Sequence, residues 1–179
     1  VLLVAVIGWA VVTYNGLIKL RNLVQEAWRQ IDVELTRRHD LIGNLVETVK
    51  GYAAHERGTL EDVVKARSAA MAPGQSPAQQ AESENMLSQA LGRLLAIVEA
   101  YPDLKANTNF LQLQSELSDI ENKIAAARRF FNNAVQEYNT SIQQMPAALF
   151  ASTFGFHQKE FFDLGETRPQ LEQAPQVKF

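Results

Sequence analysis

The first eighteen residues of the chain carry no charged side chain, and the first charges follow at Lys19 and Arg21. The core of this run reads VLLVAVIGWAVV. A helix that crosses a bilayer needs about 20 predominantly apolar residues, so the run meets the lower limit of that length. A cleaved signal peptide and a buried core helix are alternatives, but no small-residue cleavage site follows the run, and nothing else in the sequence is apolar enough to surround it. The sequence therefore predicts a transmembrane anchor over residues 1–19.

Basic residues follow this anchor at Lys19, Arg21 and Arg29. Lysine and arginine accumulate on the cytoplasmic side of membrane helices. The sequence therefore predicts a single-pass membrane protein, and these charges favour a cytoplasmic position for the domain that follows while leaving the opposite side open.

Apolar residues after the anchor recur in steps of three and four, which is the spacing of a helix with a coiled-coil-type stripe. This pattern predicts a helix from Leu20 to about Arg57, and Arg38 interrupts its apolar stripe. The sequence Thr59 to Asp62 has the form of a capping box and predicts a second, short helix. Two prolines and a glycine between Ala72 and Pro77 predict a linker. The stripe positions of the first helix are Val24, Trp28, Ile31, Leu35, Arg38, Ile42, Leu45, Val49 and Tyr52.

Two further helices follow the linker. Ser76 is predicted to cap the first of them, with Pro77 at its first position and Gln79 three residues on. Its stripe runs from Leu87 to Tyr101, and Pro102 is expected to stop it. The last long helix is predicted between about Asn107 and Met145. Its stripe consists of Phe110, Leu113, Leu117, Ile120, Ile124, Ala127, Phe131, Ala134, Tyr138 and Ile142.

Two long helices with two shorter helices between them are typical of a helical bundle. The predicted class is all-α, with the N-terminal transmembrane helix continuing into an elongated antiparallel four-helix bundle over residues 20–146. Residues 147–179 form an aromatic C-terminal tail, because five phenylalanines crowd into its first part. We expect this tail to pack on the bundle or on a neighbouring copy, with the membrane interface as a third possibility. The five are Phe150, Phe154, Phe156, Phe161 and Phe162.

Composition argues against several classes of function. Hydrophobic residues make up 46% and the formal net charge is −3, which is unlike a basic nucleic-acid binder. The chain contains no cysteine, so thiolate metal sites and cysteine nucleophiles are absent from it. His55-Glu56 does not begin a zinc motif, because the second histidine would fall at Thr59. His39 and His157 are predicted at the surface or at its boundary. The sequence predicts no enzyme, no cofactor, no metal and no nucleic-acid partner.

Charged and amide residues lie beside the apolar stripes at six positions. Carboxylates grouped in a dry cleft would suit acid–base chemistry or a metal. The spacing of the carboxylates does not place several of them at the same height along the helices. We therefore favour an interhelical network of ion pairs and amides that fixes the register of the helices. The six positions are Arg38, Asp40, Glu47, Gln114, Glu121 and Arg128.

A set of motifs extends over nearly the whole chain. They are Tyr14-Asn15, Glu26-Ala27-Trp28, RRHDLIGNLVETVKGYAAHERGTLEDVVKAR over 37–67, EAYPDLKANTNFLQLQSEL over 99–117, AARRFFNNAVQEYN over 126–139, and the closing APQVKF. Their number, order and spacing resemble the LemA family of bacterial membrane-anchored helical proteins. The resemblance implies an N-terminal transmembrane helix followed by a helical bundle, with no established enzymatic activity, and a link to the envelope or to membrane compartments such as magnetosomes. The chain departs from the family at Gly43, where proline is usual, and at Phe131, where tyrosine is usual.

The sequence is compatible with three classes of function. The leading prediction is a membrane-anchored scaffold in the bacterial envelope or a membrane compartment. Its expected partners are the lipid bilayer and further copies of itself, as a homo-oligomer. The alternative is an adaptor or sensor that binds another membrane protein in envelope stress signalling. A hydrolase would require mutually close, buried carboxylates with room for a water between helices.

Overall fold

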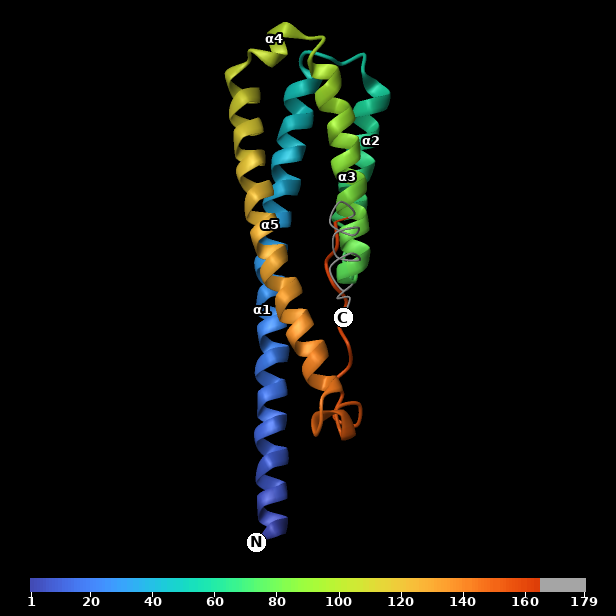
Figure 1. Ribbon diagram of the computed structural model, residues 1–179. Coiled ribbons are helices and arrows are strands. Elements are labelled where there is room, and N and C mark those ends of the chain that lie inside the picture. The colour runs from blue at the N-terminus through green and yellow to red at the C-terminus, as the bar shows by residue number, and fades with distance from the viewer. Residues whose placement is uncertain (165–179) are drawn as a thin grey trace, which may run out of the picture. The chain divides into compact units, whose positions relative to one another are not determined.

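The structure is a computed structural model that describes residues 1–164, and within them all regular secondary structure is helical (Figure 1). The predicted all-α class, with a long apolar N-terminal helix followed by further helices, is confirmed. The elements are α1 (Leu2–Lys50), α2 (Arg57–Ala70), α3 (Pro77–Val98), α4 (Pro102–Lys105), α5 (Thr108–Gln143) and a short 3-10 turn, η1 (Ala147–Leu149).

The start of α3 follows the predicted capping chemistry. The Gln79 backbone N–H donates to Ser76 Oγ at 3.3 Å, and the Ser76 N–H donates to Gln79 Oε1 at 3.0 Å. Two N–H groups that the helix itself leaves unpaired are thereby satisfied. The start of α5 is capped by Asn107, whose Oδ1 accepts from the Phe110 N–H at 3.0 Å. These local patterns were therefore sufficient to locate both helix starts.

The predicted capping box at Thr59 is wrong. α2 already begins at Arg57, Glu56 is its cap residue, and no side chain caps it. The Leu60 N–H donates to the Glu56 carbonyl at 3.1 Å, so the first helical turn forms before Thr59 is reached. α1 likewise ends at Lys50, earlier than the predicted end near Arg57, and Gly51 follows it. The helical conformation of α1 continues without interruption at Gly43.

The chain forms two compact units. Unit 1 consists of Val1–Asp32 and Ala125–Phe161, and unit 2 consists of Val33–Ile124 together with residues 162–164, the last that the structure describes. α1 and α5 each contribute to both units. The domain boundaries predicted after residues 19 and 146 stay a prediction.

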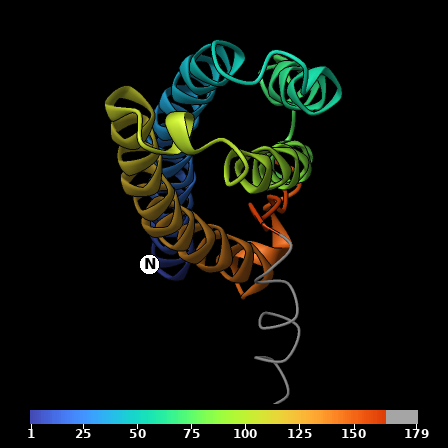
Figure 2. The same ribbon diagram turned by 90° about the horizontal axis from the view of Figure 1, so that it is seen from above.

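Unit 2 has one apolar core, to which every helix from α1 to α5 contributes. α2 and α3 lie side by side in opposite directions, joined by the predicted linker (Figure 1 and Figure 2). Tight burial of leucine and valine supplies the main favourable free energy for this association. The core residues are Ile42, Leu45, Val46, Val49, Ala53, Leu60, Val63, Ala70, Leu87, Ala90, Leu91, Leu94, Val98, Leu104, Phe110, Leu113 and Leu117.

Unit 1 buries aliphatic side chains together with aromatic ones, and several of its contacts are between rings. Trp28 on α1 contacts Phe131 on α5 with ring centroids 5.2 Å apart. Farther towards the N-terminus, Tyr14 contacts both Phe154 and Phe156 edge-on. Such edge-to-face pairs are favoured by the quadrupoles of the rings. Unit 1 therefore joins the first part of α1 to the end of α5 and the segment after it.

The beginning of α1 is long and apolar enough to cross a membrane, by length and composition, and only 6% of the residues in that stretch are buried. A core helix of a soluble protein would be mostly buried. The large side chains from Val1 to Val12 are instead exposed.

The five phenylalanines of the predicted tail have different environments. Phe156 and Phe162 are buried, Phe150 is half-buried, and Phe154 and Phe161 are exposed. The part of the predicted tail after residue 164, including the closing APQVKF motif, lies outside the described residues.

Candidate functional site

Four polar side chains are buried in unit 2. They are Arg38 and His39 on α1 and Gln80 and Glu84 on α3, with exposed fractions of 3%, 6%, 9% and 0%. Taking charges out of water costs several kcal/mol per ion unless partners replace the lost hydration. We call these four residues, with their partners Ser88 and Glu121, the polar cluster.

Glu84 is the centre of the polar cluster. Its Oε2 accepts from Arg38 Nη1 at 2.6 Å, and its Oε1 accepts from Gln80 Nε2 at 3.0 Å. Oε1 is also hydrogen-bonded to His39 Nε2. A carboxylate is an acceptor only, so the hydrogen of that bond belongs to the imidazole. Donors from two helices thus engage both oxygens of this buried carboxylate.

Arg38 links three helices. Its Nη1 pairs with Glu84 on α3, its Nη2 donates to Ser88 Oγ on the same helix, and its Nε donates to Glu121 Oε1 on α5 at 2.8 Å. The planar guanidinium has donors in fixed directions, so these bonds require one register of the three helices. The side chain of Glu121 remains 45% exposed, which reduces the desolvation cost of the second carboxylate.

α2 joins the polar cluster through backbone carbonyls. Arg67 Nε donates to the His39 carbonyl at 2.7 Å, and Gln80 Nε2 donates to the Ala70 carbonyl at 2.8 Å. The Arg67 side chain passes directly over Gly43. A methyl group at that position would lie 3.1 Å from Arg67 Nη2, closer than most side-chain contacts. Glycine at this position therefore makes room for the link between α1 and α2.

The structure brings together two of the six positions predicted for a polar network, Arg38 and Glu121. Asp40, Glu47 and Gln114 are exposed instead. Glu47 Oε1 lies 3.7 Å from Lys50 Nζ, one turn along the same helix. Arg128 is half-buried and belongs to unit 1.

Sequence reasoning missed the two polar residues of α3. The stripe identified from Leu87 onward extends backwards to Glu84 and Gln80 in the same steps of three and four. Their position on this otherwise apolar stripe was therefore the sequence feature that could have indicated two buried polar side chains. The predicted surface or boundary position of His39 is wrong, because α1 buries two adjacent side chains at this level. His157 is exposed, as predicted.

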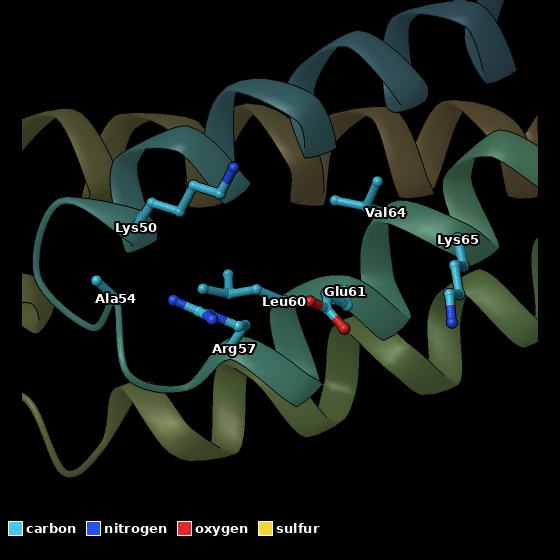
Figure 3. Close-up of a pocket in the computed structure, with 7 residues that line it drawn as sticks. All are labelled: Lys50, Ala54, Arg57, Leu60, Glu61, Val64 and Lys65. Atoms are coloured by element: carbon cyan, nitrogen blue, oxygen red, sulfur yellow. The ribbon is translucent and has the colours of Figure 1, made fainter.

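A groove lies on the surface of unit 2 between the end of α1 and α2 (Figure 3). Its volume is about 740 Å³. Three cationic side chains and one carboxylate line the groove together with three apolar residues, which gives the groove an excess of positive charge. We call it the cationic groove, and its lining residues are Lys50, Ala54, Arg57, Leu60, Glu61, Val64 and Lys65.

A second, smaller groove of about 360 Å³ lies between α1 and α5 in unit 2. Three carboxylates and two cations line it, so its charge excess is negative. We call it the acidic groove, and its lining residues are Arg37, Asp40, Leu41, Glu116, Asp119, Ile120 and Lys123. Within residues 1–164, no group of three or more His, Cys, Asp or Glu side chains is placed to hold a metal ion.

Next to the cationic groove, Tyr101 closes the turn after α1. Its hydroxyl donates to Glu56 Oε1 at 3.0 Å and lies 2.5 Å from His55 Nε2. Partial burial, together with the hydrogen bond to the Glu56 carboxylate and its charge, raises the pKa of Tyr101 above 10.0.

Comparison with known proteins identifies one matching family and several similar relatives. The profile of the LemA family matches residues 27–179. Magnetosome protein MamQ of Magnetospirillum gryphiswaldense is 27% identical over 185 residues, which cover 89% of this chain and 68% of the relative. Magnetosome protein MamQ 2 of Paramagnetospirillum magneticum is 26% identical, covering 95% of this chain and 74% of the relative.

Protein LemA of Metamycoplasma hominis is 28% identical over 128 residues, which cover 72% of this chain and 58% of that protein. The family profile covers most of the chain, including the three long motifs noted in the sequence at residues 37–67, 99–117 and 126–139. The resemblance is thereby confirmed, and the chain belongs to the LemA family.

Proposed function

We propose that this protein is a non-enzymatic, membrane-anchored scaffold that assembles with further copies of itself through unit 2. The uncharged start of α1, with its exposed apolar side chains, supports the anchor. A bilayer is the medium in which such a helix is stable without protein neighbours.

The cationic groove is the observation that most directly supports self-assembly. Its floor is apolar at Leu60 and Val64, and its rim has more cations than carboxylates. A groove of this kind suits an acidic surface with some apolar side chains, because charge complementarity steers and orients association.

The acidic groove supplies the complementary surface on the same chain. Asp40, Glu116 and Asp119 are exposed there beside Leu41 and Ile120. A contact between the cationic groove of one copy and the acidic groove of the next joins two different surfaces. Such a heterologous contact repeats from copy to copy, and it either closes into a ring or extends as a row.

The polar cluster supports a structural role for the interior of unit 2. Glu84 is engaged by donors from Arg38, His39 and Gln80, and these bonds link α1 and α3. In this proposal the cluster holds the helices in one register, so that both grooves keep their shape and can repeat in an assembly.

A charge-reversal pair tests this assembly. The full chain is placed in lipid nanodiscs or detergent, and its mass is measured by light scattering after size-exclusion chromatography. Lys65→Glu or Asp119→Lys alone should dissociate the assembly, because each places like charges across the contact. The double variant should restore it. Glu82→Lys, an exposed change on α3 outside both grooves, is the matched control and should leave the mass unchanged.

Two outcomes would contradict the proposal. A wild-type chain that stays monomeric at micromolar concentration would exclude self-assembly. If a photo-crosslinker at residue 65 captures a single foreign membrane protein in stoichiometric amount and no second copy, the adaptor function replaces the scaffold.

A further inference from the structure

A second stretch without charge follows α5. Residues 143–156 contain no aspartate, glutamate, lysine or arginine, and they include Met145, Leu149 and three phenylalanines. Most of this stretch is a compact loop that contains η1. We call residues 144–156 the aromatic loop.

The aromatic loop lies beside the uncharged run of α1. The Phe154 and Phe156 rings are 5.6 and 5.5 Å from the ring of Tyr14. Tyr14 is near the end of that run, since the first charge follows at Lys19. Arg21, about two helical turns after Tyr14, places its guanidinium 5.0 Å from the Phe156 ring. The loop is thus at the level of α1 where apolar sequence gives way to charge.

The loop has both buried and exposed apolar side chains. Ala147, Ala151 and Phe156 are buried and hold the loop in unit 1. Three large apolar side chains of the loop, Met145, Leu149 and Phe154, are instead 67%, 73% and 57% exposed. Large apolar side chains grouped on a surface mark a contact with a membrane or a partner.

The end of the loop is fixed by Asn139 of α5. Its Oδ1 accepts from the Lys159 N–H at 2.8 Å, and its Nδ2 donates to the Lys159 carbonyl at 3.0 Å. Lys159 Nζ lies over the Tyr138 ring at 5.6 Å. Two cations of unit 1, Arg21 and Lys159, therefore lie against the rings of Phe156 and Tyr138.

We infer that the aromatic loop inserts into the interface of the bilayer that α1 crosses, and so provides a second attachment to the same membrane. This inference rests on the proposed anchor. If the uncharged run up to Ile18 spans the bilayer, Tyr14 lies at the interface, and the loop that contacts Tyr14 lies at the same depth. Aromatic and apolar side chains are favoured at that depth, and cations beside it suit lipid phosphates.

This attachment has a consequence for α1. A single spanning helix is free to tilt and to rotate about its own axis in a bilayer. A loop held against one face of α1 and immersed in the interface restricts both motions, so unit 1 is held in one orientation to the membrane.

The absence of cysteine from the sequence allows a direct test. Spin labels are attached to single cysteines in the full chain, Leu149→Cys and Phe154→Cys, in vesicles of phosphatidylethanolamine and phosphatidylglycerol at a low protein-to-lipid ratio. The accessibility of each label to oxygen and to a water-soluble nickel chelate reports its depth. Gln158→Cys, exposed in the same unit, is the matched aqueous control, and Ile7→Cys reports on the anchor.

The inference predicts that labels at 149 and 154 lose nickel accessibility and gain oxygen accessibility relative to the label at 158. If the label at 7 is deep and those at 149 and 154 remain aqueous, the inference is wrong while the anchor stands. An aqueous label at 7 overturns the anchor itself. Protection of residue 149 in detergent that grows with protein concentration, with aqueous exposure in vesicles, would assign the loop to a second copy and overturn the inference.

Discussion

The two units of this protein have different interiors. Among residues 1–164 the buried polar residues, Arg38, His39, Gln80 and Glu84, all belong to unit 2. The buried residues of unit 1 are aliphatic or aromatic, and its ring contacts include that between Trp28 and Phe131. Hydrogen bonds to a buried carboxylate demand fixed directions, whereas the burial of apolar side chains is non-directional.

This difference matches the tasks that we propose for the units. Unit 2 carries two grooves whose shapes have to be the same in every copy of an assembly. Unit 1 holds the uncharged run of α1 and the aromatic loop, which meet lipid. Buried charges add little net stability while intact but make the register costly to change, because a broken pair leaves a desolvated charge.

Removal of the buried carboxylate of Glu84 is expected to have the largest effect on the free energy of unfolding. Glu84→Ala leaves Arg38 and His39 buried without their partner and should lower the free energy of unfolding of the chain by about 3–5 kcal/mol. Urea denaturation in detergent measures the change. Glu82→Ala, on the same helix but exposed, should stay within about 0.5 kcal/mol of wild type. Equal effects of the two substitutions would show that the polar cluster does not fix the register of the helices in unit 2.

A smaller effect is expected in unit 1. Phe131→Leu keeps the site apolar but removes the ring that contacts Trp28, and it should cost about 1–2 kcal/mol. Phe130→Leu changes the adjacent, exposed ring and serves as the control under the same denaturation conditions. If Phe131→Leu costs as much as Glu84→Ala, the contrast between the two interiors fails.

Two glycines in helices provide a matched pair. Gly92 in α3 has open space around it, so Gly92→Ala should stabilise the chain by about 1 kcal/mol through helix propensity. Gly43→Ala gains the same helix propensity. Its added methyl group, however, lies too close to the Arg67 side chain and weakens the hydrogen bond from Arg67 to the His39 carbonyl. Its net effect on the melting temperature should therefore be smaller than that of Gly92→Ala. A larger gain at residue 43 would mean that the Arg67 link contributes nothing.

The smallest effect concerns pH. The folded-state pKa of Tyr101 is above its ordinary value of 10.0, so between pH 10 and the raised pKa the folded chain binds more protons than the unfolded chain. The stability contributed by the neutral Tyr101 is complete below pH 10 and is lost as pH rises through the raised pKa. Thermal melts of wild type and Tyr101→Phe should show a steeper decline above pH 10 for wild type. Parallel curves would contradict the interaction with Glu56.

Local patterns in the sequence predicted much of this structure. The helix start at Ser76 followed from capping chemistry, since its bonds form between residues close in sequence, and the start of the last helix was predicted near Asn107. The interruption of the α1 stripe at Arg38 predicted a polar contact across helices.

Other features depend on which helices meet, and a stripe pattern does not contain that information. α1 in unit 2 contacts more than one helix, so it buries Arg38 and His39 side by side as well as the single stripe. The sequence interpretation therefore placed His39 wrongly. The partner of Arg38 on α3 was missed for a simpler reason, because the α3 stripe was begun at Leu87 instead of at Gln80.

The central claim of this account is that the uncharged run of α1 crosses the bilayer. The most direct test uses single cysteines at Val11 and Gln25 of the full chain in vesicles opened by a pore-forming peptide, with a maleimide that does not enter lipid. We predict that Gln25→Cys is labelled at once and that Val11→Cys is labelled only after detergent is added. Equal labelling of the two positions in the intact bilayer would contradict the claim.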